Sequence, residues 1–388
     1  MHRTSSLPIQ LAVAMAIVVF ISARNADADE PAVVPFTVEP SSIELTGRLD
    51  RIQLQVTDRS AERIDDLTRR VKFAIEPASV LSIDSAGRVR PLADGEAAIV
   101  VTHGGDTVRV PAKVSGLGTS ATNFARDIIP ILSKTGCNQG ACHASQYGKG
   151  EFKLSLFGYA PEQDHPQFVR DWQQRRVSFV DPVSSLILKK ATLQVSHGGG
   201  QRFKVGSFEY DQMLDWLATG ASGTTKTDPQ VVGMSISPEQ RVYSKGDSQQ
   251  LRVVATYDDG STRDVTHLAI YDSMGEGVAT VDRLGLVSAV GPGQAAIMVR
   301  FQGQAKVSMA MLPHRTDPDL SGFVVQNFVD EEVKKHWQKL GVIPAGLCSD
   351  EVFIRRAFLD SLGTLPSREK VEAFLASDKP NKREELVD

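Results

Sequence analysis

The sequence has few aromatic residues, few cysteines and no excess of charge of either sign. Phe, Trp and Tyr make up 6% of the 388 residues, and there are three cysteines, too few for a disulfide-dense scaffold. The balance of 43 basic and 47 acidic residues argues against a nucleic-acid partner, because such proteins usually carry a basic excess. Since 41% of the residues are apolar, we expect a folded chain of several domains.

The first 28 residues have the pattern of an export signal. His2 and Arg3 precede an apolar run at residues 7–21, which is shorter than the roughly 20 residues that span a bilayer. Ala26 and Ala28 then form a small-residue A-x-A cleavage site. We expect cleavage after Ala28, export to the periplasm or the cell surface, and no membrane span in the mature chain. An uncleaved membrane anchor is the alternative.

Two parts of the chain repeat each other at an offset of 198 residues. Nine residues between Asp84 and Gly105 recur between Asp282 and Gly303. Repetition over so long a period indicates duplicated modules. Each copy alternates apolar and polar residues, as half-buried strands do, with Asp, Gly and Ser where turns are expected. We predict two small β-sandwiches, at residues 33–116 and 230–313.

The second copy resembles a known domain family. Its segments 259–266 (DGSTRDVT), 279–282 (ATVD) and 285–295 (GLVSAVGPGQA) resemble the group 2 bacterial immunoglobulin-like domain. The first copy has residues 59–63 (RSAER) in place of the tight Asp-Gly turn. The resemblance implies immunoglobulin-like sandwiches that act as spacers or adhesion units, with a cell-surface polysaccharide or protein as a partner.

Between the copies, two cysteines and a histidine form a compact motif. Residues 137–143 read CNQGACH, so that His143 directly follows Cys142. Covalent haem attachment uses such an arrangement, because two thiols form thioethers with the vinyl groups and the adjacent imidazole binds the iron. The usual spacing puts two residues between the cysteines, and here there are four. Two other interpretations remain open: a Cys137–Cys142 disulfide, and a zinc or copper site.

The surrounding sequence resembles planctomycete-type cytochrome c domains. Segments 124–132 (FARDIIPIL), 182–188 (PVSSLIL) and 215–221 (DWLATGA) resemble their first helix, middle segment and last helix. The resemblance implies a mainly α, cytochrome c-like domain at residues 120–222, with haem c on Cys137 and Cys142 and with His143 as the proximal ligand. Such domains have a distal methionine before the last helix. This sequence has SHGGG at residues 196–200 instead, so we expect His197 as the distal ligand and a lowered potential.

Two neighbouring features have structural interpretations. Arg170, Arg175 and Arg176 are predicted to form a solvated helix face, and contact with haem propionates or with an acidic redox partner is the alternative. Met213 lies on the same helical face as Trp216, so we predict that Met213 belongs to the core.

Residues 320–388 have a helical pattern. One helix is expected to run from Phe323 toward Trp337, and Ser349 is the expected cap of the next. Segment 353–366 (FIRRAFLDSLGTLP) resembles the opening of a domain of unknown function in large planctomycete secreted proteins. We expect the chain to carry only the N-terminal part of that domain, as a fragment or truncated gene product. Cys348 has no predicted partner.

Together these features predict an exported multi-domain protein in which a haem domain lies between two all-β sandwiches. Its predicted function is electron transfer to or from an unidentified redox partner. No Ser/His/Asp set, phosphate loop or carboxylate pair indicates an enzyme. Two alternatives remain: an extracellular structural or adhesion protein stapled by a Cys137–Cys142 disulfide, and a hydrolase whose catalytic part lies beyond residue 388.

Overall fold

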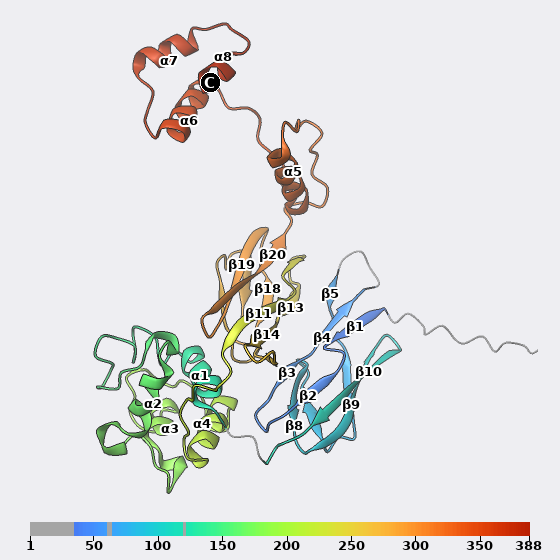
Figure 1. The fold of residues 1–388 in the computed structure, drawn as a ribbon. Helices are drawn as coiled ribbons and strands as arrows, with labels where there is room; N and C mark the ends of the chain where they lie inside the picture. Colours follow the sequence, from blue (N-terminus) through green and yellow to red (C-terminus); the bar gives the residue numbers. More distant parts are fainter. Residues whose placement is uncertain (1–34, 60–63, 119–121) are drawn as a thin grey trace, which may run out of the picture. The chain divides into compact units, whose positions relative to one another are not determined.

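The computed structural model describes residues 35–59, 64–118 and 122–388 (Figure 1). Strands occur within residues 36–114 and 231–312, and helices within residues 124–218 and 328–387. The predicted export signal at residues 1–28 lies outside the described residues, as does most of the 59–63 turn. In the part of the chain that is described, no helix is long and apolar enough to cross a membrane.

The first β-sandwich, as far as its residues are described, contains ten strands in three sheets. The strands are β1 (Phe36–Glu39), β2 (Ile43–Leu45), β3 (Ile52–Gln53), β4 (Gln55–Asp58), β5 (Asp65–Asp66), β6 (Lys72–Glu76), β7 (Leu81–Ile83), β8 (Arg88–Pro91), β9 (Gly95–His103) and β10 (Asp106–Val114). The sheets have the orders β2-β10-β9-β6, β1-β4-β5 and β3-β8-β7. β2 pairs with β10 in parallel.

The second β-sandwich repeats this topology strand for strand. Its strands are β11 (Val231–Ser237), β12 (Gln240–Val242), β13 (Ser248–Gln250), β14 (Arg252–Tyr257), β15 (Thr262–Asp264), β16 (Ile270–Ser273), β17 (Ala279–Val281), β18 (Leu286–Ala289), β19 (Gly293–Phe301) and β20 (Gln304–Leu312). The sheets have the orders β12-β20-β19-β16, β11-β14-β15 and β13-β18-β17, and β12 pairs with β20 in parallel. β18, β19 and β20 begin 198 residues after β8, β9 and β10. The predicted duplication into two β-sandwiches is therefore confirmed.

Alternation along the strands and one repeated glycine explain this fold. Leu251, Val253 and Ala255 occupy alternate positions of the second copy and are each 0% exposed. Gly87 and Gly285 occupy the same turn of the two copies and have φ values of 76° and 83°. A Cβ atom at either position would also lie within 2.9 Å of a neighbouring side chain. Both the backbone and the available space therefore require glycine in this turn.

Short helices fill residues 124–218 around an aromatic core. The elements are the π-helical turn η1 (Phe124–Ile128), α1 (Ile129–Lys134), the 3-10 turns η2 (Leu156–Gly158), η3 (Asp171–Gln174) and η4 (Pro182–Ser184), and the helices α2 (Pro161–Val169), α3 (Leu186–Ala191) and α4 (Phe208–Ala218). Trp216, Phe124 and Phe168 are at most 1% exposed, and their ring centres lie 5.3–5.8 Å apart. Such packing of large rings anchors the short helices, which are too short to be stable alone.

The last helix of this segment has a capping residue at its start and a glycine after its end. Ser207 caps α4, since its side chain accepts a hydrogen bond from the Tyr210 N–H. Gly220 follows the helix with φ of 95°, as a glycine does where a helix ends. Met213 on this helix is 2% exposed, so its predicted place in the core is confirmed.

The C-terminal residues form four helices: α5 (Phe328–Leu340), α6 (Asp350–Leu362), α7 (Arg368–Leu375) and α8 (Lys382–Val387). The expected helix start at Phe323 is wrong. The Asn327 side chain accepts hydrogen bonds from the Val329 and Asp330 N–H groups, and this cap starts the helix at Phe328. Ser349 does precede α6 as expected, although its side chain makes no capping hydrogen bond there.

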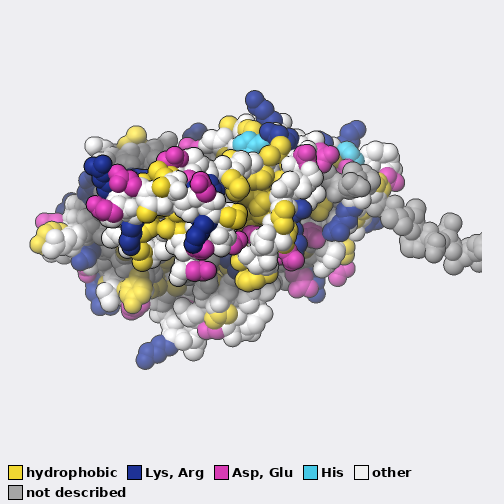
Figure 2. Space-filling model, turned by 90° about the horizontal axis from the view of Figure 1, so that it is seen from above, with side chains coloured by type: hydrophobic (Ala, Val, Ile, Leu, Met, Phe, Trp, Pro, Cys, Tyr) yellow, Lys and Arg dark blue, Asp and Glu magenta, His cyan; other side chains and the backbone are white. Residues whose placement is uncertain are grey.

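Charges of both signs share the surface. On the face drawn in Figure 2, Lys and Arg side chains are interspersed with Asp and Glu side chains, and apolar side chains lie between them. This distribution agrees with the formal net charge of −4. The absence of a nucleic-acid partner remains a prediction.

Candidate functional site

One cavity in the helical segment brings the four predicted site residues together. Cys137, Cys142, His143 and His197 all line it. Its volume of about 260 Å³ is just below the range of about 300–1,000 Å³ that is usual for ligand pockets, and it opens to solvent. The other lining side chains are apolar or basic: Leu132, Phe152, Phe168, Leu186, Ile187, Ala191, Phe203 and Met213, with Lys149, Arg176, Lys190 and Arg202.

The turn after α1 folds the two cysteines toward the same cavity. Gly136 ends the helix with φ of 78°, and the Cys137 N–H donates back to the Leu132 carbonyl over 2.8 Å. The His143 N–H then donates to the Cys137 carbonyl over 3.1 Å. This hydrogen bond closes the segment between the cysteines into a loop, so that both thiols line the cavity in spite of the four intervening residues.

The two imidazoles have the spacing of ligands to one metal ion. The ring centres of His143 and His197 lie 6.4 Å apart, and the ring planes differ by 9°. An ion with one nitrogen of each ring on opposite sides of it, at about 2.0–2.1 Å, would place the two ring centres roughly 6.3 Å apart, so the observed spacing allows one ion between the rings. Sequence reasoning thus selected a pair of histidines that the structure does bring together, although they are far apart in the chain.

Backbone carbonyls fix the tautomer of both rings. Nδ1 of His143 lies 2.9 Å from the Phe152 carbonyl oxygen, and Nδ1 of His197 lies 2.8 Å from the Gly200 carbonyl oxygen. A carbonyl only accepts, so Nδ1 carries the proton in each ring and Nε2 keeps the lone pair that a metal needs. Burial lowers the pKa of His143, the Phe152 bond opposes this, and nearby His197 lowers it again. The neutral, metal-binding form of the ring is therefore favoured.

All three cysteines of the chain are free thiols. Cys137 Sγ lies 3.3 Å from the Thr135 hydroxyl. Burial raises the pKa of Cys137, and this outweighs the Thr135 hydrogen bond and the Arg202 charge, which lower it. Arg202 also donates through Nη2 to Cys142 Sγ over 3.5 Å. Burial thus keeps Cys137 in its neutral thiol form.

Four cations and no carboxylate line the cavity. Arg176 is only 8% exposed, and its guanidinium lies 4.8 Å from the centre of the Phe152 ring. It donates to the carbonyls of Gln167 and Glu151 over 2.7 and 3.0 Å. The predicted solvated face is therefore wrong for Arg176, because its two backbone acceptors hold it inside. No carboxylate lines the cavity itself, so its positive charge favours an anionic ligand.

Sequence reasoning missed three of these cations and the contact that places Arg176. Lys149, Lys190 and Arg202 carry no motif, and only the folded chain brings them to the cavity. Met213 also lines it, in addition to its place in the core. The zinc or copper interpretation fits poorly, because no group of three or more His, Cys, Asp or Glu residues able to hold an ion exists in the described part of the chain.

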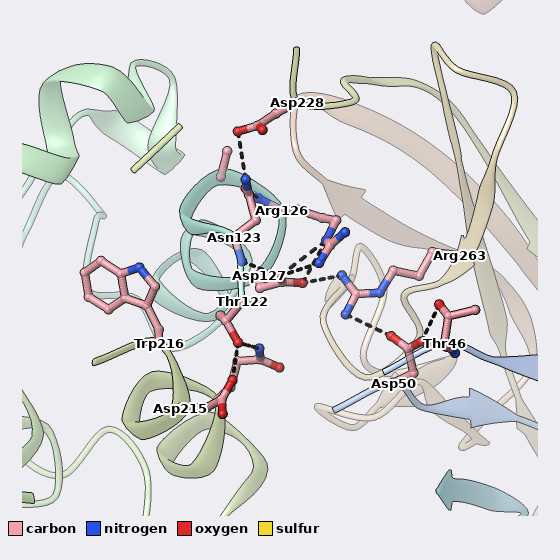
Figure 3. A network of polar contacts seen from close by, with 12 residues as sticks. Thr46, Asp50, Thr122, Asn123, Arg126, Asp127, Asp215, Trp216, Asp228 and Arg263 are labelled. Atoms are coloured by element: carbon pink, nitrogen blue, oxygen red, sulfur yellow. Dashed lines mark hydrogen bonds and ion pairs between the residues drawn. The ribbon is translucent and has the colours of Figure 1, made fainter. Parts of the chain in front are cut away.

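A polar network fixes the helical turn that leads into α1 (Figure 3). Asp127 on η1 is 3% exposed and accepts hydrogen bonds from Arg263, over 2.7 Å, and from Arg126. Arg263 also lies 3.7 Å from Asp50. Burial would raise the pKa of Asp127, but the two arginines outweigh it and hold the pKa below its usual range. The carboxylate is therefore ionised, and it holds the start of the segment that leads to Cys137.

Two family matches cover parts of the chain. Residues 230–309 match the bacterial Ig-like domain (group 2), and residues 328–388 match a protein of unknown function, DUF1549. The first match confirms the resemblance to the group 2 bacterial immunoglobulin-like domain, and the second agrees with the predicted domain of unknown function at the C-terminal end. A comparison with curated proteins finds no match.

Several solved structures of the surface-layer protein SbsC show a low similarity. Its domains 5–6 are 10% identical to the chain, with 71% of this chain and 96% of that one covered and a TM-score of 0.28. Its domains 1–6 are 11% identical, with a TM-score of 0.19, and the chain spans 23% of that structure's length. Scores this low do not indicate a shared overall fold.

Proposed function

We propose that residues 120–222 form a c-type haem domain and that the exported protein transfers electrons. In this proposal Cys137 and Cys142 carry the haem through thioethers, His143 is the proximal ligand and His197 the distal ligand. When bound, the haem supplies one-electron redox chemistry at its iron.

The main support for this proposal is the geometry of the two imidazole rings, which line the same cavity as both thiols. Their ring centres lie 6.4 Å apart with nearly parallel planes, and both Nδ1 atoms are bonded to carbonyls. Hydrogen bonds of this kind orient metal-binding histidines and fix the nitrogen that binds. These hydrogen bonds support His143 and His197 as the pair of metal ligands.

The rest of the lining supports the same ligand. Haem has an apolar ring and two carboxylates, and the cavity offers apolar side chains and four cations without a carboxylate. Phe152, Phe168 and Phe203 contribute apolar surface to the cavity, while Arg176 and the lysines complement negative charge. A disulfide-stapled adhesion domain would have no use for this combination.

The immunoglobulin-like sandwiches fit a role as spacers or adhesion units at the cell surface or in the periplasm. Their glycines serve turns and their alternating residues serve the cores. We also propose that the cytochrome-like segment and the C-terminal helices are related to domains of planctomycete secreted proteins. The redox partner in this proposal is a separate protein.

Expression with an export signal and cytochrome c maturation machinery tests the haem. We expect a haem-stained band on a denaturing gel and a Soret band from the purified protein. The Cys137→Ser/Cys142→Ser double variant is the control and should lose the stained band. If the wild type shows neither haem stain nor a Soret band and mass spectrometry finds a Cys137–Cys142 disulfide, the result would support a structural or adhesion protein instead.

A further inference from the structure

Two lysines stand at the mouth of the cavity. Lys149 and Lys190 line it, and both are exposed, whereas Arg176 is buried and Arg202 is half-buried. Among the described residues, neither lysine belongs to an ion pair with a carboxylate. We call Lys149 and Lys190 the rim lysines.

Each rim lysine is connected to the segment that holds one imidazole. Lys190 donates through Nζ to the Ser196 carbonyl over 2.9 Å, next to His197. Lys149 forms a β-bridge with Phe152, whose carbonyl holds Nδ1 of His143. The two exposed positive charges therefore lie on the segments that carry the two predicted axial ligands.

The sequence around the cavity is basic although the whole chain is acidic. Residues 143–206 contain nine Lys and Arg residues and five Asp and Glu residues, whereas the whole chain has a formal net charge of −4. Fields are screened over about 8–10 Å at physiological salt. An approaching molecule at the mouth therefore meets the local positive charge rather than the net negative charge.

We propose that the rim lysines are the docking site of an acidic redox protein. Such a partner would bring carboxylates against Lys149 and Lys190 at the opening nearest to both imidazoles. Complementary charge steers the encounter and raises its rate. In the encounter the partner loses one electron that the haem iron gains, or the reverse, so this use of the site rests on the proposed haem function.

A redox-inactive anion can locate binding at the rim lysines without any electron transfer to haem. The probe is hexacyanochromate(III), whose unpaired electrons broaden nearby amide signals in the NMR spectrum of the isotope-labelled full chain. Tris(ethylenediamine)chromium(III), a cation, is the matched probe. We expect the anion to broaden the amides around residues 149 and 190 most strongly and the cation to spare them. Broadening that is strongest elsewhere, or equal for both probes, would overturn the docking site.

Charge reversal provides the matched variants. Lys149→Glu/Lys190→Glu should abolish the anion-induced broadening at the mouth. Lys113→Glu/Lys306→Glu, at exposed positions of β10 and β20, changes the net charge equally and should leave the broadening in place. If the rim variant fails to fold, as judged by its far-UV circular dichroism, Lys149→Gln/Lys190→Gln takes its place and should weaken the broadening.

Electron exchange with ferricyanide then tests the function of the rim. In the haem-loaded protein, the bimolecular rate should fall with rising salt in spite of the net negative charge. The rim variant should be slower by about tenfold at low salt, and the control variant should not be. A rate that rises with salt, or an equal loss in both variants, would contradict the proposal. If no haem attaches, the proposed haem function is contradicted. The anion docking site is then tested by the probe experiment alone.

Discussion

The imidazole rings of His143 and His197 lie 6.4 Å apart with planes 9° from parallel, although 53 residues separate them in the sequence. Each ring has its Nδ1 bonded to a backbone carbonyl. Backbone carbonyls therefore orient both rings, and such an orientation would lower the cost of binding a metal between them.

Replacing His197 by alanine should open one coordination site and leave the haem attached. The proposed thioethers of Cys137 and Cys142 would not depend on His197, whereas the proposed distal ligation of the iron would. We expect a shifted Soret band and new binding of carbon monoxide to the reduced protein, measured by absorption spectroscopy. Met213→Leu is the control, since Met213 also lines the cavity. A spectrum that changes in the Met213 variant and not in the His197 variant would assign the distal position to the methionine.

Replacing Arg176 by glutamine should lower the reduction potential. Arg176 is a buried cation, and its loss would stabilise the more positive, oxidised iron of the proposed haem. We expect a redox titration to show a reduction potential lower by on the order of 60 mV. For a one-electron couple this corresponds to a tenfold change in the equilibrium constant. Arg175→Gln is the control because Arg175 is exposed and does not line the cavity. If Arg176 only supports the fold, Arg176→Gln will lower the unfolding midpoint and leave the potential in place.

The sequence predicts the parts of this molecule that depend on local pattern or on duplication. Strand alternation and the 198-residue offset are properties of neighbouring residues, and they predict both sandwiches. The CNQGACH segment predicts that Cys137, Cys142 and His143 act together because they are adjacent. The start of α5 is predicted wrongly, since the apolar residues before Asn327 continue the helical pattern and only the cap interrupts it.

The lining of the cavity could not be predicted from the sequence, because long-range packing places it. Arg176 and Arg175 are neighbours of the same type, yet Arg176 is buried because it reaches the carbonyls of Gln167 and Glu151, whereas Arg175 is exposed. Arg202 reaches Cys142 from 60 positions away. Charge, hydropathy and spacing are alike for the buried and the solvated basic residues, so the sequence pattern alone does not separate them.

Replacing Gly285 by alanine should destabilise the second sandwich more than replacing Gly260. Both glycines have φ near 82°, so both variants carry the strain of a left-handed residue, about 1 kcal/mol. A Cβ at Gly285 would lie 2.9 Å from the Tyr271 ring, whereas nothing lies within 4 Å at Gly260. We expect a loss of about 2–4 kcal/mol for Gly285→Ala, measured by urea unfolding. Equal losses would show that Tyr271 moves aside freely.

Replacing Asp127 by asparagine should destabilise the protein in a pH-dependent way. The variant leaves the Arg263 guanidinium facing a neutral amide, and breaking such a buried pair costs about 3–5 kcal/mol. Because the folded pKa of Asp127 is depressed, its stabilising contribution is present above the unfolded pKa of about 3.9. It is lost as the pH falls through the lower folded pKa.

Urea unfolding of the wild type and of Asp127→Asn, at pH 7 and at stepwise lower pH, measures this contribution. The two unfolding midpoints should differ most at neutral pH and converge in acid, since protonation of Asp127 gives the wild type a neutral side chain too. Asp259→Asn is the control, because that carboxylate is solvent-exposed and holds only a nearby turn through Ser261. A midpoint difference that stays constant into acid would show that the carboxylate charge contributes nothing and that only the shape of the side chain does.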